Sequence, residues 1–320
     1  MRSMLRTHAP ALAVFAILAL AGPFVLSGNR FFAFILGMTL IHILWASGMN
    51  LLSGYTGLMP LMFAGIAGIS AYACVDLAAA GWSYWLAMPV GIVGAALVGV
   101  VLGIPSLRLK GFYFTLCSLV IQTVITLAFV YFAGFTNGDT GLSQIPLPGD
   151  MPPTRYELVL AIFAIAGIAV SIALVGSSFG RRIIAIREDD VLAETLGIDV
   201  TRQKLLAFFV ASLFAGLGGA LYAPYVGFIS PRSFDVLLSL NIWLMVAFGG
   251  RGTIWGPVVG AALLAPTPYL LQNYYMIKDI IYGLLIIAVV VAMPNGLMSG
   301  LRLPMRFGRT KSVMPRERVG

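Results

Sequence analysis

The run ELVLAIFAIAGIAVSIALVG, residues 157–176, decides the fold class. After its first residue it contains no charged side chain, and its length is close to the roughly 20 residues that an apolar α-helix needs to cross a lipid bilayer. Similar runs recur along the 320-residue chain, which is 60% hydrophobic, 10% charged and has a mean hydropathy of +0.97. Soluble proteins contain about 25% charged residues. The composition therefore indicates a membrane-embedded protein.

A helical fold follows, because lipid offers no hydrogen-bond partners to the backbone of a spanning segment. We expect an all-α polytopic integral membrane protein with about 10 membrane segments (8–10). The segments lie near residues 10–28, 31–52, 58–79, 84–104, 111–133, 157–176, 205–227, 236–249, 256–271 and 279–293. The stretch 236–271 is expected to hold either full spans or short re-entrant helices. Arg2 and Arg6 before the first segment also resemble the start of a signal peptide.

One mixed-charge stretch, GRRIIAIREDDVLAETLGIDVTRQK at residues 180–204, interrupts this apolar pattern. The side of the membrane on which this stretch lies can be predicted, because basic residues concentrate in the cytoplasmic loops of membrane proteins. With the N-terminus inside, the cytoplasmic set holds 15 of the 20 Lys and Arg residues. These are Arg2, Arg6, Arg108, Lys110, Arg181, Arg182, Arg187, Arg202, Lys204, Arg302, Arg306, Arg309, Lys311, Arg316 and Arg318. We therefore expect both termini, the 180–204 loop and the basic 298–320 tail to be cytoplasmic.

Catalytic chemistry is poorly represented in the sequence. The two histidines, His8 and His42, form no metal-ligand spacing with carboxylates or cysteines, and no nucleotide-binding glycine loop appears. We expect no catalytic residues, no metal, no cofactor and no nucleic-acid partner. The seven carboxylates outside residues 180–204 lie at span ends, in loops or in the tail, where an ion-coupled transporter would not place its coupling acid. Energy for uphill transport would then come from another subunit.

The mixed-charge stretch has the pattern of a docking helix. Glu188-Asp189-Asp190 suits the first turn of a short helix, apolar residues follow at spacings of three and four, and Gly197 suits its end. Helices shorter than about 12–15 residues are marginal alone, so this one needs a surface to lie on. A partner protein would supply that surface. The plainer interpretation is a solvated loop, but simple stop signals need basic residues rather than interleaved acids.

A solute path is harder to locate. Gly-rich backbone at membrane depth is tolerated where it lines a cavity, and two such breaks occur, at residues 54–57 and 249–252. His42 lies near the middle of a span, either on the path or as a neutral imidazole bonded to a neighbouring helix. The candidate path residues are His42, Asn50, Gly54, Tyr55, Gly57, Gly249 and Gly250.

Several motifs together resemble one family. The stretches at 185–190, 193–198 and 204–208 are similar to the signature of LivM-type permeases, the membrane subunits of branched-chain amino-acid ABC importers. Further similar motifs are NLLSGYTG at 50–57, SLRLKGFYF at 106–114, TNGDTGL at 136–142, GGRG at 249–252 and PNGL at 294–297. Their shared order covers most of the chain. The resemblance implies a single permease domain over residues 1–320 in a bacterial inner membrane.

The resemblance also implies partners. These are two ABC ATPase subunits, a second permease subunit of LivH type, and a periplasmic substrate-binding protein that meets the outer loops near 134–155 and 229–235. The coupling residues it implies are Arg187, Glu188, Asp189, Ala193, Glu194, Leu196 and Gly197. Residues 58–64 are wholly apolar, unlike the polar continuation common in the family, which puts the substrate in doubt. Urea or short amides are alternative substrates, and an ATP-independent channel or secondary carrier is an alternative mechanism.

Overall fold

The structure, a computed structural model, describes residues 2–26, 28–109, 111–272, 280, 283–284 and 297–299. Its helices are α1 (Arg2–Val25), α2 (Arg30–Ser53), α3 (Phe63–Ala79), α4 (Tyr84–Leu107), α5 (Phe112–Tyr131), α6 (Ala133–Thr136), α7 (Pro153–Val175), α8 (Ser178–Glu188), α9 (Asp190–Thr195), α10 (Val200–Val226), α11 (Val236–Gly249), α12 (Gly256–Leu264) and α13 (Thr267–Leu270). Short 3-10 turns are η1 (Gly138–Thr140), η2 (Pro148–Asp150), η3 (Pro231–Phe234) and η5 (Leu297–Ser299). Two strands, β1 (Leu142–Ser143) and β2 (Phe228–Ile229), complete the described elements.

The helical membrane class is confirmed. Seven stretches in the described ranges are long and apolar enough to cross a bilayer, and α3 is a shorter apolar helix of 17 residues. They are Thr7–Val25, Arg30–Ser53, Tyr84–Leu107, Phe112–Tyr131, Pro153–Val175, Val200–Val226 and Pro231–Gly249. The expected total of about 10 stays a prediction, because the span near 279–293 and the 298–320 tail lie largely outside the described residues.

Helices α2 and α10 form the centre of the molecule. Within its most apolar window, 78% of α2 is buried, against 11% for α1 at the periphery. The Trp45 indole of α2 donates to the Ala215 carbonyl of α10 across 3.1 Å. On another side α10 approaches α3 so closely that a Cβ added to Gly219 would lie 2.0 Å from the Ala67 carbonyl oxygen. Small residues permit such backbone contact, which is the way membrane helices pack tightly.

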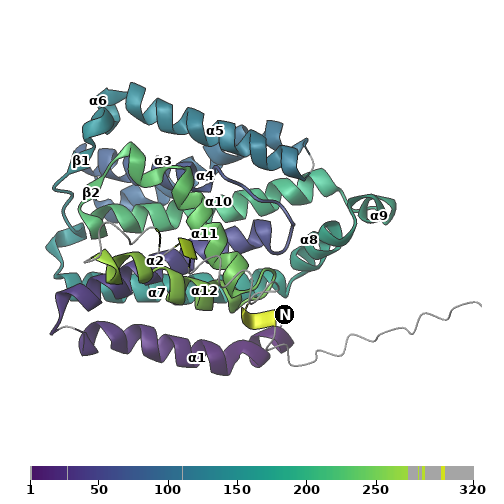
Figure 1. The fold of residues 1–320 in the computed structure, drawn as a ribbon, viewed down its shortest axis with the longest axis horizontal. Coiled ribbons are helices and arrows are strands. Elements are labelled where there is room, and N and C mark those ends of the chain that lie inside the picture. The colour runs from purple at the N-terminus through teal and green to yellow at the C-terminus, as the bar shows by residue number, and fades with distance from the viewer. Residues whose placement is uncertain are drawn as a thin grey trace, which may run out of the picture.

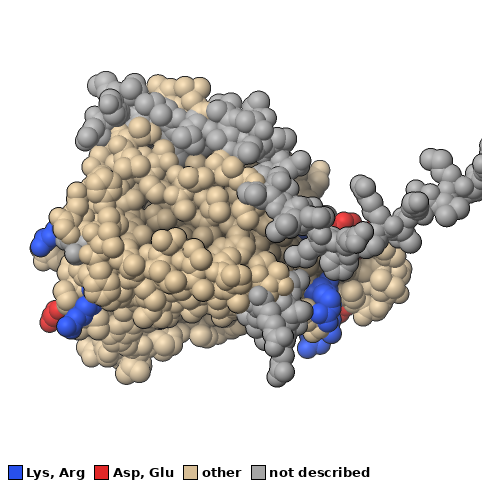
Figure 2. Space-filling view, turned by 90° about the horizontal axis from the view of Figure 1, so that it is seen from below, with Lys and Arg blue, Asp and Glu red and all other residues tan. Residues whose placement is uncertain are grey.

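The two ends of the helix bundle differ. At one end lie α8, α9 and the start of α1, with α9 projecting from the body, while α6, β1 and β2 lie at the other end (Figure 1). There β1 and β2 pair antiparallel, with Leu142 opposite Ile229, so the loop after α5 is joined to the loop after α10. Blue and red charged groups gather at both ends of the visible face, and the described surface between them is tan (Figure 2). This uncharged belt is the part that fits a lipid bilayer.

Three local boundaries differ from the sequence expectation. Residues 58–62 are not helical, and α3 begins only at Phe63. Helix α10 begins at Val200 because the Asp199 carboxylate caps it, accepting the Arg202 N–H at 2.9 Å. Glu188 does not open the docking helix: it is the last residue of a separate helix, α8, and Asp189 caps the docking helix instead. Apolar runs locate spans well, but caps decide where the helices begin.

Candidate functional site

The projecting docking segment is a short capped helix. The Asp189 carboxylate accepts hydrogen bonds from the backbone N–H groups of Val191 at 2.9 Å and Leu192 at 3.1 Å, which starts α9. At the other end Gly197 has φ +80°, the left-handed conformation that ends helices, as its position in the sequence predicts. Lys204 Nζ on α10 lies 2.7 Å from the Asp190 carboxylate, which ties α9 to the bundle.

The sides of α9 differ in polarity and burial. Ala193 is buried and packs in a small cluster with Ile186 of α8 and Val200 of α10. Three apolar side chains of this segment are covered by no part of the described chain: Val191 is 63%, Leu192 58% and Leu196 71% exposed. Glu188, Asp189 and Glu194 are exposed around them. An exposed apolar patch ringed by charge is typical of a protein–protein contact.

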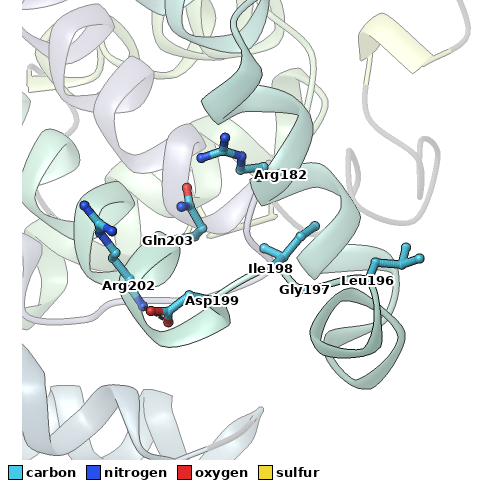
Figure 3. A pocket seen from close by; sticks show the side chains of 7 residues that line it. All are labelled: Arg182, Leu196, Gly197, Ile198, Asp199, Arg202 and Gln203. Atoms are coloured by element: carbon cyan, nitrogen blue, oxygen red, sulfur yellow. Dashed lines mark hydrogen bonds between the residues drawn. The ribbon is translucent and has the colours of Figure 1, made fainter.

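A groove of about 400 Å³ runs beside this helix, between α8, α9 and the start of α10. Figure 3 shows Arg182, Gln203 and Arg202 on one side of it, while Leu196 points away. Among the described residues, neither arginine forms an ion pair with a carboxylate. The Gln203 side-chain oxygen is buried and has no hydrogen-bond partner in the part of the chain that the structure describes. The groove therefore offers two positive charges and an amide oxygen to a partner.

A second site lies where both glycine breaks of the sequence meet. Asn50, 3% exposed near the end of α2, donates from Nδ2 to the Thr253 carbonyl at 2.9 Å. Its Oδ1 accepts the Gly252 N–H at 3.0 Å. The backbone of Gly54 also lies close to this loop, since a Cβ added to Gly54 would lie 2.6 Å from the Gly252 nitrogen. The end of α2 and the 250–255 loop between α11 and α12 are thus fastened together by one side chain.

Arg187 joins the docking segment to this same point. Its Nη1 donates to the Gly54 carbonyl, and a Cβ added to Gly252 would lie 2.6 Å from that nitrogen. Burial and the Arg187 charge together lower the pKa of the nearby Arg251, whose guanidinium lies 4.3 Å from the centre of the Trp243 ring. Burial raises the pKa of Tyr55, and the Arg187 charge and Asn50 partly oppose that rise. We call the contact of Arg187, Asn50, Gly54 and Gly252 the polar junction.

A small cavity lies beside the polar junction. Its volume is about 10 Å³, which is enough for a single water molecule at most. It is lined by Ser47, Asn50, Leu51, Tyr55, Ile168, Ser171, Ile254 and Pro257. The lining mixes apolar side chains with a few polar groups, as small-molecule sites do. In this structure the space is closed to anything of amino-acid size.

The predicted path residues therefore divide. Asn50, Gly54 and Tyr55 lie at the polar junction or its cavity. Gly249 instead packs α11 against α12, where a Cβ would lie 1.8 Å from the Gly256 carbonyl oxygen. His42 lies two turns from Asn50 along α2, with Nδ1 2.8 Å from the carbonyl of Met38 on its own helix.

Gly57 and Gly250 also lie near the polar junction without forming its hydrogen bonds. A Cβ added to Gly57 would lie 3.5 Å from the Arg187 Cγ, and Gly250 has φ +121°. Sequence reasoning did not assign Gly252 and Thr253 to the site, although Gly252 stands in the quoted GGRG motif. Sequence reasoning also did not assign Arg182 and Arg202, which line the groove, to the site. Across the ranges that the structure describes, no three His, Cys, Asp or Glu side chains come together as a metal site.

Comparison with known proteins gives a consistent family. Residues 31–290 match the family described as branched-chain amino acid transport system / permease component. The chain is 28% identical to the high-affinity branched-chain amino acid transport system permease protein LivM of Escherichia coli, over 92% of this chain and 76% of that protein. It is 27% identical to LivH of the same organism over 45% of this chain and 47% of that protein.

A relative that matches a shorter part of the chain has another substrate in its name. The guanosine ABC transporter permease protein NupQ of Bacillus subtilis is 34% identical over 38% of each chain. No solved structure is significantly similar.

Proposed function

Because the chain belongs to the family of branched-chain amino acid transport system permease components, we propose that it is the membrane subunit of an ABC importer. It carries branched-chain or other apolar amino acids by alternating access, and separate ATPase subunits hydrolyse the ATP. The observation that carries this mechanism is the projecting α9, which is capped at both ends and exposes Val191, Leu192 and Leu196.

Docking of an ATPase explains why this helix exists. A six-residue helix is too short to hold in water by itself, and exposing three large apolar side chains costs free energy. A groove on a partner would cover the apolar side. The unpaired guanidinium groups of Arg182 and Arg202 would meet acidic side chains of that partner and set its register. Two ATPase subunits fit an assembly of two permease chains, of which the second is of LivH type.

Orientation follows from charge. We place the end that carries α8, α9 and the start of α1 in the cytoplasm, since the positive-inside rule assigns 15 of the 20 basic residues to that side. Both termini are then cytoplasmic, in a bacterial inner membrane. The β1–β2 end faces outward and receives the periplasmic substrate-binding protein. Since the ladder joins the loops near 134–155 and 229–235, they offer one continuous docking surface.

The solute path is assigned to the neighbourhood of the polar junction. Its cavity combines apolar side chains from α2, α7 and α12 with the hydroxyl groups of Ser47, Tyr55 and Ser171. Ser171 Oγ is buried and has no hydrogen-bond partner among the described residues, so it could bind a polar group of a solute. Such a lining suits a molecule with an apolar side chain and a polar head, as in the branched-chain amino acids.

Reconstitution tests the function. The proteoliposomes should hold the chain, a LivH-type partner and ATPase subunits, with the binding protein on the face opposite the ATPase subunits. We expect them to take up radiolabelled leucine only when ATP is supplied. Uptake by the purified chain alone, without ATPase subunits, would refute the proposal and favour a channel or carrier.

A substitution on α9 tests docking. Leu196→Arg should weaken co-purification of the ATPase subunits by about 30-fold, since losing a central apolar contact costs about 2 kcal/mol or more. Leu196→Met keeps an apolar side chain and is the matched control. Equal ATPase binding by the two variants would show that α9 is not the docking helix.

A further inference from the structure

We propose that Arg187 is the positioning residue through which movement of the docking segment reaches the end of α2 and the 250–255 loop. The inference rests on the proposed function, and it adds how the ATPase contact is connected to the closed cavity. Arg187 is the next to last residue of α8, two residues before the cap of α9. A displacement of α9 therefore reaches Arg187 at once.

The guanidinium binds to backbone rather than to a carboxylate. Its Nη1 donates to the Gly54 carbonyl, and within the described ranges no acidic side chain forms an ion pair with it. Releasing this contact separates a charge from a carbonyl dipole, which is easier than separating two buried opposite charges. The nearby Arg251 adds repulsion, since the Arg187 charge is one cause of its lowered pKa. The contact is suited to being made and broken in each transport cycle.

Gly252 has the geometry that receives Arg187. Its φ of +71° lies in the left-handed region that favours glycine, and an added Cβ would lie 2.6 Å from the Arg187 Nη1 and 3.0 Å from the Gly54 oxygen. Any side chain there would push the guanidinium out of its place. Arg187 therefore contacts the 250–255 loop as well as the end of α2.

The small cavity lies beside this contact, so a displacement of Arg187 would change the space that is open to a solute. Asn50 and Tyr55 on one segment and Ile254 and Pro257 on the other line a space of about 10 Å³. A leucine-sized solute can pass only if the end of α2 and the 250–255 loop separate or shift. Arg187 holds the end of α2 beside Gly252, so pulling α8 away would loosen the closure that Arg187 helps to hold.

The test measures coupling in the reconstituted complex, as leucine transported per ATP hydrolysed. Arg187→Ala should lower this ratio about tenfold, within the range of measured couplings between sites. The ATPase subunits should still co-purify, because the exposed side of α9 is unchanged. Arg187→Lys should recover part of the ratio, since one ammonium can still donate to Gly54. Arg181→Ala, at an exposed position on the same helix, is the matched control and should leave the ratio unchanged.

A second variant approaches the contact from the other side. Gly252→Ala should give the same low ratio without changing any residue of the docking segment. If Arg187→Ala and Gly252→Ala both transport with the wild-type ratio, the inference is wrong while the proposed function stands. If the wild-type complex shows no ATP-dependent uptake at all, the proposed function itself has failed. If both variants merely lower the unfolding temperature and transport in proportion to the folded fraction, Arg187 has a structural role only, and the inference is overturned.

Discussion

Replacing Asn50 by alanine should destabilise the fold at a defined place. The substitution removes the bonds to the Thr253 carbonyl at 2.9 Å and from the Gly252 N–H at 3.0 Å, and it leaves both backbone groups without that partner. An unsatisfied buried group costs about 1–3 kcal/mol, but both bonds are only part-buried, so water can recover some of the loss. Measured side-chain hydrogen bonds in a membrane protein average about 0.6 kcal/mol each. We therefore expect the free energy of unfolding to fall by about 1–3 kcal/mol.

The assay is thermal unfolding of the purified chain in detergent, followed by tryptophan fluorescence, with Ser47→Ala as the control. Ser47 lies one turn earlier on α2 and lines the same cavity, but its hydroxyl donates at 2.7 Å to the Ile43 carbonyl of its own helix. Its loss should therefore cost little. A clear fall in the unfolding temperature for Asn50→Ala alone is the expected result. Equal unfolding temperatures for both variants would show that the link between α2 and the 250–255 loop contributes nothing to stability.

Two further predictions concern glycines. Gly219→Val should prevent α10 from packing on α3, because its Cβ would lie 2.0 Å from the Ala67 oxygen, and we expect about 3 kcal/mol or more of destabilisation, seen as loss of monodisperse protein. Gly94→Ala has open space around its Cβ and should be neutral; if it proves as harmful as Gly219→Val, close packing is not the reason. Gly197→Val should impair the end of α9 through φ +80° alone, so it should lower ATPase co-purification with little effect on membrane insertion, whereas Gly197→Asn should be milder. Glu194→Arg, which reverses an exposed charge on α9, should likewise reduce ATPase binding; unchanged binding by both Gly197→Val and Glu194→Arg would argue against docking at this helix.

The sequence predicted the helical membrane fold because apolar length alone specifies a span. It also predicted a short helix ending at Gly197, since caps are local and their signals are residue types at fixed spacing. Glu188 was placed on the wrong helix because three successive acids each suit a first turn, and only the actual hydrogen bonds of Asp189 choose among them. The number of spans beyond the described residues stays a prediction.

The polar junction could not be derived from the sequence. Asn50 and Gly252 are about 200 positions apart, and no periodicity relates them. Both glycine breaks were recognisable, but their meeting depends on how α2, α11 and α12 pack. The family resemblance implies Arg187 as one of seven coupling residues, but its bond to the Gly54 carbonyl is visible only in the structure. Pairings between distant backbone groups and side chains are the part of the site that three-dimensional structure alone supplies.

Helix α10 constrains how the gene can change. Its 27 residues begin one position after Asp199, beside the docking segment, and end two positions before β2, at the opposite end of the bundle. The helix is about 40 Å long, and each residue advances it by about 100° of rotation. A single inserted or deleted codon within it would turn one end by that angle relative to the other. Either α9 or the strand pairing at Ile229 would then face the wrong way. The length of α10 is therefore constrained from both ends, by the docking segment at its start and by the strand pairing after its end.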